Sequence, residues 1–166
     1  MFLKVIPVAA AAVFSMSAFA VEKEITVTAQ VDPIVELLDP SGAALPSDMP
    51  MQHLPGKGLS KITFDAKLFA NDKKDIELRL QDEPKLLHTI DTTAAPIPLA
   101  VSVDGTPLKT TVTTLKAADL FTGNDTVSKT MSFSIEQKTQ GAVQTAGLYR
   151  GPVRLVVTSA ASATTP

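Results

Sequence analysis

Hydrophobic and polar residues alternate along most of this chain. A period of two places alternate side chains on opposite faces of a strand, so the pattern predicts short β-strands with one buried face. Asp104-Gly105 adds a hairpin-turn signal directly after one such segment. The alternating segments are 24–31, 62–68, 76–81, 99–103, 131–136 and 149–157.

Turn-forming residues separate these segments. Only residues 114–121 have a helical pattern, with Thr114 as the expected N-cap. Many short strands with regular turns favour an antiparallel β-sandwich of immunoglobulin type. The turn-rich stretches are 39–42, 55–58 and 94–98.

The first 20 residues have the pattern of a secretory signal peptide. Lys4 precedes an apolar run at 5–14, and Ala18-Phe19-Ala20 matches a cleavage site. The alternative is a membrane anchor, but a spanning helix needs about 20 apolar residues. Removal of 20 from 166 residues leaves 146, the size of one domain. We therefore expect the mature chain to begin at Val21 after export into the periplasm.

Composition excludes several classes of function. The chain has no cysteine, which rules out disulfides, thiol catalysis and cysteine metal sites, so its stability must come from burial or association. The net charge is −2 and no basic run is present, so we expect no nucleic-acid partner. The two histidines, His53 and His88, lie in turn-rich segments without a partner motif. We expect no catalytic residue, no cofactor and no metal site.

The two ends of the mature chain carry the most information. Residues 21–31 form a clean alternating strand, which Pro33 interrupts as a strand boundary or a hinge. After Ser159 no further core strand is predicted. The front strand could be the ordinary first strand of a self-contained sandwich, or it could fill a gap in another copy. Residues of the final strand expected to edge that gap are Tyr149, Gly151, Val153, Leu155 and Val157.

Several stretches resemble one known family. They are 21–33, 37–38, 42–47, 69–72, 78–80, 98–103 and 145–153. Together they are similar to the class 5 (alternate-chaperone pathway) fimbrial major pilins, which include the colonization factor antigen and cable pilus major subunits. The family often has Trp-Gly-Gly where this chain has Val103-Asp104-Gly105, so local packing there should differ.

The resemblance implies an all-β fold: an incomplete immunoglobulin-like β-sandwich lacking its last strand, with an N-terminal donor strand. Residues 21–33 would be the donor extension and 34–166 the pilin domain. The protein would build a surface fimbria that supports adhesion, and its partners would be other copies of itself, a periplasmic chaperone, an outer-membrane usher and a tip adhesin subunit. The donor residues would be Ile25, Val27, Ala29 and Val31.

Two alternatives belong to other classes. A self-contained secreted or periplasmic immunoglobulin-like binding module would be a stable monomer with its first strand paired in its own fold. A tip adhesin usually carries an added receptor-binding domain, for which 146 of the 166 residues leave no room.

The signal-peptide pattern predicts that Val21 is the N-terminus of the surface protein. Mass spectrometry of protein sheared from expressing cells should find a chain that starts at Val21. A chain that still carries Met1 would contradict export by cleavage.

Overall fold

The computed structural model describes residues 34–123 and 125–161, and the statements below concern this part of the chain. The predicted donor residues and Pro33 lie outside it. Nearly every element is a β-strand, and every pairing is antiparallel. The elements are β1 (Val35–Leu38), β2 (His53–Leu54), β3 (Gly58–Leu59), β4 (Ile62–Ala70), β5 (Ile76–Leu80), β6 (Lys85–His88), β7 (Ile97–Val103), β8 (Thr106–Pro107), β9 (Thr113–Leu115), α1 (Ala117–Leu120), β10 (Met131–Gln137), β11 (Tyr149–Arg150) and β12 (Leu155–Ser159).

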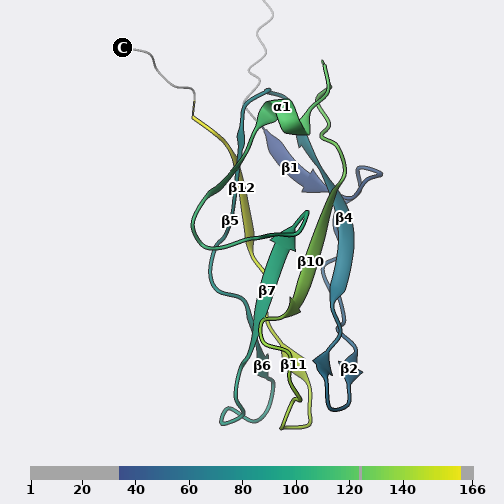
Figure 1. The fold of residues 1–166 in the computed structure, drawn as a ribbon, viewed down its shortest axis with the longest axis vertical. Coiled ribbons are helices and arrows are strands. Elements are labelled where there is room, and N and C mark those ends of the chain that lie inside the picture. The colour runs from purple at the N-terminus through teal and green to yellow at the C-terminus, as the bar shows by residue number, and fades with distance from the viewer. Residues whose placement is uncertain (1–33, 124, 162–166) are drawn as a thin grey trace, which may run out of the picture. The chain divides into compact units, whose positions relative to one another are not determined.

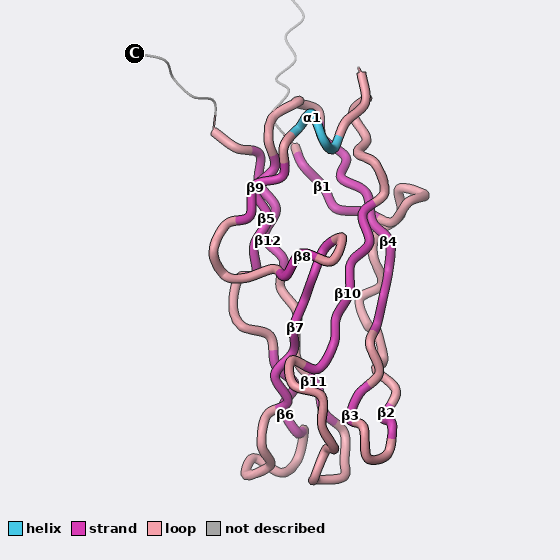
Figure 2. The backbone as a smooth tube through the Cα atoms, viewed as in Figure 1, coloured by secondary structure: helices cyan, strands magenta, loops and turns pink. Residues whose placement is uncertain are grey.

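The strands form two main sheets and one small hairpin. The larger sheet has the order β1-β4-β10-β7-β6-β11, with β8 also paired to β7. The smaller sheet has the order β12-β5-β9, and β2 pairs with β3. Figures 1 and 2 show the two sheets along the long axis of the domain, with α1 near one end and β6 and β11 near the other. This curled, two-sheet arrangement confirms the predicted β-sandwich.

The core fills the space between the sheets with the side chains that the alternation places on one face. Phe133 is fully buried, and its ring stacks on Phe64 with a centroid separation of 5.4 Å. The predicted strands β4, β5, β7 and β10 all contribute their expected inner faces. The most deeply buried side chains are Ala66, Leu68, Ile76, Leu78, Met131 and Phe133.

The predicted Asp104-Gly105 turn is confirmed. Both residues have positive φ, 46° and 77°, as the tight turn between β7 and β8 requires. The Asp104 carboxylate also accepts a hydrogen bond from the backbone N–H of Ser132 at 2.8 Å, which ties the turn to β10.

The predicted helix is shorter than expected, and Thr114 is not its cap. Thr114 lies in β9, opposite Glu77 of β5, so strand pairing overrides the local helical pattern. The N-cap of α1 is Lys116, which makes no side-chain cap hydrogen bond. Instead, Asp75 accepts hydrogen bonds from Lys116 Nζ at 2.8 Å and from the N–H of Ala117 at 3.0 Å. The bond from Lys116 is the largest cause that lowers the pKa of Asp75.

The predicted C-terminal strand is two strands rather than one. β11 pairs with β6 in the larger sheet, whereas β12 pairs with β5 in the smaller sheet, so the chain crosses between sheets at 151–154. Pro152 has no N–H to donate to a ladder. Gly151 lies so close to the carbonyl oxygen of Lys85 that a side chain would not fit. These two residues explain why the alternation at 149–157 does not give a continuous strand.

His88 organises the loops beside β6 and β11. Its Nδ1 accepts hydrogen bonds from the N–H groups of Ile90 at 3.2 Å and Asp91 at 2.8 Å. Nε2 therefore carries the proton of the neutral ring and donates to the carbonyl oxygen of Ala146 at 3.1 Å. The ring also meets Tyr149 edge to face, with centroids 4.9 Å apart.

This network predicts different roles for the two histidines. His88→Ala removes three hydrogen bonds and an aromatic contact, and should lower the free energy of unfolding by about 1–3 kcal/mol. His53→Ala, at an exposed position in β2, should change it by less than about 0.5 kcal/mol. Urea unfolding followed by circular dichroism would measure both variants in the same background. Equal effects would contradict the structural role of His88.

Candidate functional site

Two edge strands that belong to different sheets lie close together in this domain. In the described part of the chain, β1 pairs only with β4, and β12 pairs only with β5. Between them is a groove of about 470 Å³. Within the described residues, no strand pairs with the facing edge of either one. The groove is lined by Ile34, Val35 and Glu36 on one side and by Val157, Thr158 and Ser159 on the other.

Toward its open edge, the backbone of β12 presents hydrogen-bonding groups that have no strand partner among the described residues. In an antiparallel ladder, alternate residues turn their N–H and C=O groups toward the partner strand. The N–H of Ala160 donates to Asp75, and Arg154 accepts from Gln81, so even-numbered residues face β5. The odd-numbered residues Leu155, Val157 and Ser159 consequently point their backbone groups to the open edge.

β1 likewise presents backbone groups to its open edge. The N–H of Asn71 donates to the carbonyl oxygen of Ile34 at 3.2 Å, which marks even-numbered residues of β1 as those bonded to β4. Val35 and Leu37 therefore point their backbone groups away from β4. Each edge offers the template that an added strand would need.

Inward-facing side chains of the two edge strands are more exposed than their partners on the neighbouring strands. Val157 lies directly opposite Leu78, and Leu37 lies directly opposite Leu68, so each pair shares the inner face. Leu78 and Leu68 are buried at 2% and 1% exposure, whereas Val157 and Leu37 are only half-buried. The inward-facing side chains are therefore buried on the inner strands and only partly buried on the edge strands.

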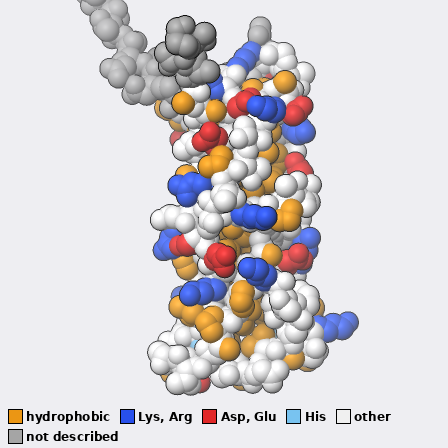
Figure 3. Space-filling view, turned by 60° about the vertical axis from the view of Figure 1, so that its left-hand side comes forward, with side chains coloured by type: hydrophobic (Ala, Val, Ile, Leu, Met, Phe, Trp, Pro, Cys, Tyr) orange, Lys and Arg blue, Asp and Glu red, His pale blue; other side chains and the backbone are white. Residues whose placement is uncertain are grey.

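This partial exposure extends along the domain. Figure 3 shows hydrophobic side chains between charged ones along one face, with a further group near the lower end. An apolar side chain that reaches solvent at an inward position loses part of its hydrophobic stabilisation, about 25 cal/mol for each Å² left exposed. Half-buried hydrophobic side chains that pack on the core include Val35, Leu37, Leu45, Phe64, Ile135, Val153, Leu155 and Val157.

The structure brings together only some of the residues that the sequence predicts for the groove edge. Leu155 and Val157 lie on the inner face of β12, and Val153 packs on the core before that strand begins. Tyr149 instead pairs with His88, and Gly151 packs on Lys85. The donor positions Ile25, Val27, Ala29 and Val31 lie outside the described residues.

The opposite wall of the groove was not predicted from the sequence. Val35 and Leu37 alternate with Glu36 directly after Pro33, so a short period-two signal was present. Because β1 is only four residues long, that signal is weak without the pairing to β4.

The described residues contain no group of three or more histidine, aspartate or glutamate side chains placed to hold a metal ion. In the same part of the chain, no helix has the length and apolar character needed to cross a membrane.

Comparisons with known proteins identify the family of this chain. The family model described as CS1 type fimbrial major subunit matches residues 21–158. A CFA/I fimbrial subunit of Escherichia coli O78:H11 (strain H10407 / ETEC) is 38% identical over 151 residues, covering 87% of this chain and 88% of the relative. A CS1 fimbrial subunit of Escherichia coli is 36% identical over 152 residues, with the same coverage of both chains, 87% and 88%.

The fold has solved counterparts. The CooA pilin subunit of enterotoxigenic Escherichia coli superposes with a TM-score of 0.64 at 30% identity, covering 75% of this chain and 86% of that chain. A chain of a chaperone–tip adhesin complex of CFA/I fimbriae has a TM-score of 0.55 at 15% identity, covering 76% of this chain and 42% of that one, and shares the fold alone. With a family model that spans most of the sequence and two relatives above 35% identity, the chain belongs to the CS1 type fimbrial major subunits and is a structural subunit of bacterial surface fimbriae.

Proposed function

We propose that this subunit polymerises by donor-strand exchange, with residues 21–33 of one copy occupying the groove between β1 and β12 of the next. The observation that carries the proposal is the pair of open strand edges with half-buried inner side chains. A strand added between them would bond to both edges and cover both sets of side chains. Strand addition at an exposed edge is a known mode of recognition.

The donor segment has the pattern that the groove requires. Ile25, Val27, Ala29 and Val31 recur every second residue and would share one face. Full burial of a valine or isoleucine contributes about 1.5–3 kcal/mol, and each ladder hydrogen bond adds about 0.5–1.5 kcal/mol. Several of each together exceed the lower estimates of the cost of association, about 4–15 kcal/mol.

A donor on one part of the molecule and an acceptor on another make a heterologous contact. Repetition of such a contact gives a filament unless the rotation closes a ring. Each copy would be donor to one neighbour and acceptor to another, which is the property that the shaft of a fimbria needs. In this proposal the shaft displays a tip adhesin subunit and supports adhesion to host cells or surfaces.

The open groove also implies helpers before assembly. An exposed apolar groove with unpaired strand edges promotes aggregation. A periplasmic chaperone would cover the groove after export, and an outer-membrane usher would exchange that cover for the donor strand of the next copy. The cell-surface fimbria is thus reached through the periplasm.

Moving the donor strand tests the proposal directly. The mature chain without a chaperone should aggregate or polymerise, because its groove is open. A variant with residues 21–33 moved behind a short C-terminal linker should be a soluble monomer, because it fills its own groove. Analytical ultracentrifugation and thermal unfolding would compare the two. If the unmodified chain is already a monomer with concentration-independent unfolding, a self-contained binding module is the correct description.

A matched pair of substitutions tests which face of the donor strand enters the groove. Val27→Asp would bury an unpaired carboxylate and lose about 1.5–3 kcal/mol of valine burial. Thr28→Asp would place the same charge in water and should cost less than about 0.5 kcal/mol. Electron microscopy of cells that express the whole assembly system should show no fibres for Val27→Asp and nearly normal fibres for Thr28→Asp. Equal loss in both variants, or none in either, would refute the assigned facing.

A further inference from the structure

The proposed donor strand is connected to its own domain by a very short segment. Only Asp32 and Pro33 separate Val31, the last donor residue, from Ile34. Ile34 is fixed to its own domain, because its N–H donates to Asn71 Oδ1 at 2.8 Å and its carbonyl oxygen accepts from the Asn71 N–H at 3.2 Å. Three Cα–Cα steps span at most about 11 Å. Two consecutive domains must therefore touch where Val31 leaves the acceptor groove.

The domain has two distinct ends that could make this contact. The near end is a group of segments connected by backbone and side-chain hydrogen bonds. These segments are Ile34, 71–75, α1, 122–127 without residue 124, and 159–161. The far end comprises β6, β11 and the loops 89–96 and 138–148. These two sets lie at opposite extremes of the long axis in Figure 1.

A filament requires that the near end of one copy meets the far end of the next. Every donor strand leaves its domain at the near end. If Val31 also left the acceptor at the acceptor's near end, each domain would hold both neighbours at one end, and successive near ends would converge on one point. Exit at the far end avoids this. Because β1 leaves the near end and β12 arrives there, the donor would then run antiparallel to β12 and parallel to β1.

Both ends carry exposed hydrophobic side chains suited to such a contact. At the far end, Leu87, Ile90 and Leu148 are 48%, 87% and 56% exposed. A hydrogen bond from the N–H of Thr89 to the carbonyl oxygen of Leu148, 2.8 Å long, joins the two loops that carry Ile90 and Leu148. At the near end, Ile34 is 54% exposed. Of the five exposed large hydrophobic residues in the described chain, only Val112 lies at neither end.

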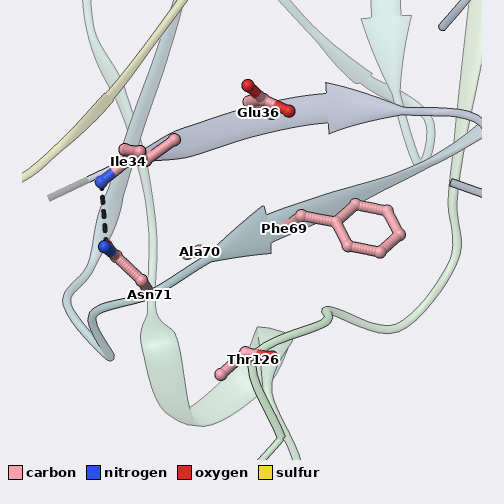
Figure 4. A pocket seen from close by; sticks show the side chains of 6 residues that line it. All are labelled: Ile34, Glu36, Phe69, Ala70, Asn71 and Thr126. Atoms are coloured by element: carbon pink, nitrogen blue, oxygen red, sulfur yellow. Dashed lines mark hydrogen bonds between the residues drawn. The ribbon is translucent and has the colours of Figure 1, made fainter. Parts of the chain in front are cut away.

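The near end is also hollowed. Ile34 borders a depression of about 390 Å³, whose other lining residues come from β1, from the end of β4 and Asn71 directly after it, and from the loop after α1. Figure 4 shows Ile34, Phe69 and Thr126 around this depression, with the hydrogen bond from Ile34 to Asn71 at its rim. Its apolar lining residues are Ile34, Phe69 and Ala70, which a protruding apolar side chain of another copy could contact beside the polar Glu36, Asn71 and Thr126.

From these observations, and resting on the donor-strand exchange proposed above, we infer a second interface between consecutive copies. Ile90, Leu87 and Leu148 of the acceptor pack against the depression beside Ile34 of the donor. The strand supplies the connection, and this end-to-end contact fixes the orientation of one domain on the next, which a two-residue connection alone would leave free to rotate.

Cysteine cross-linking tests the contact, because the natural chain has no cysteine. The variant Thr126→Cys with Ile90→Cys is assembled into fibres in expressing cells, and the sheared fibres are treated with a short bis-maleimide. After boiling, which separates non-covalent subunits, denaturing electrophoresis should show a ladder of covalent oligomers. The control variant Thr126→Cys with Asp65→Cys, the latter on the exposed side of β4, should give no ladder.

Each outcome bears on the contact separately from strand exchange. Fibres that form normally but give no ladder with the first pair, or equal ladders with both pairs, would overturn the interface and leave the donor strand in place. Cross-linked dimers from Thr126→Cys alone would show near ends in contact and would also overturn it. A wild-type chain that forms no fibres would count against the proposed function on which the interface rests.

A substitution pair gives an independent readout. Ile90→Asp should leave the fold intact, because the side chain is 87% exposed, and fibres should still form by strand exchange. Introduced into the Thr126→Cys background with Leu148→Cys, it should reduce the ladder at least several-fold. Val112→Asp, at an equally apolar exposed position away from both ends, should leave the ladder unchanged. Unchanged cross-linking in the Ile90→Asp variant would contradict the contact.

Discussion

Leu78 and Val157 lie opposite each other on paired strands, on the side of the sheet that holds the core, yet only Leu78 is shielded from water. The same imbalance separates Leu68 from Leu37 at the other wall of the groove. A sandwich whose two edge strands both show their inner faces needs one more strand to complete its core. That single deficit connects the fold to the proposed function, in which the donor strand of another copy supplies the missing cover.

Much of this arrangement could be predicted from local pattern. β4, β5, β7 and β10 alternate strictly, and their inner side chains form the core that the sequence indicates. The turn at Asp104-Gly105 is fixed by two residues that tolerate positive φ, which is a local property. On the C-terminal wall of the groove, the alternation placed Leu155 and Val157 on the correct face. In each of these places, residues that are close together in the sequence determine the local conformation.

The predictions from sequence are wrong where pairing with a segment far away in the chain determines the local structure. Thr114 belongs to β9 because β5 accepts it as a strand neighbour, and α1 is held by Asp75, which lies 42 residues before Ala117. Gly151 and Pro152 divide the last strand because the backbone of Lys85 lies against Gly151. β1, the other wall of the groove, is four residues long, and its pairing with β4 establishes it as a strand. Apart from the short alternation at 35–37, none of these pairings leaves a periodic signal in the segment that it reshapes.

Because the chain has no cysteine, the stability of the domain depends more strongly on the burial that a filled groove provides. Small secreted domains often rely on disulfides, and in a chain without cysteine the stability must come from burial or association. In the proposed fibre, the strand that completes each core is covalently part of the adjacent copy, so the stability of the domain and the cohesion of the fibre are one free energy. Force along the fibre would act along the donor strand, and ladder hydrogen bonds run perpendicular to it. Such bonds share a shearing load and must fail together, which suits a filament that is loaded along its length.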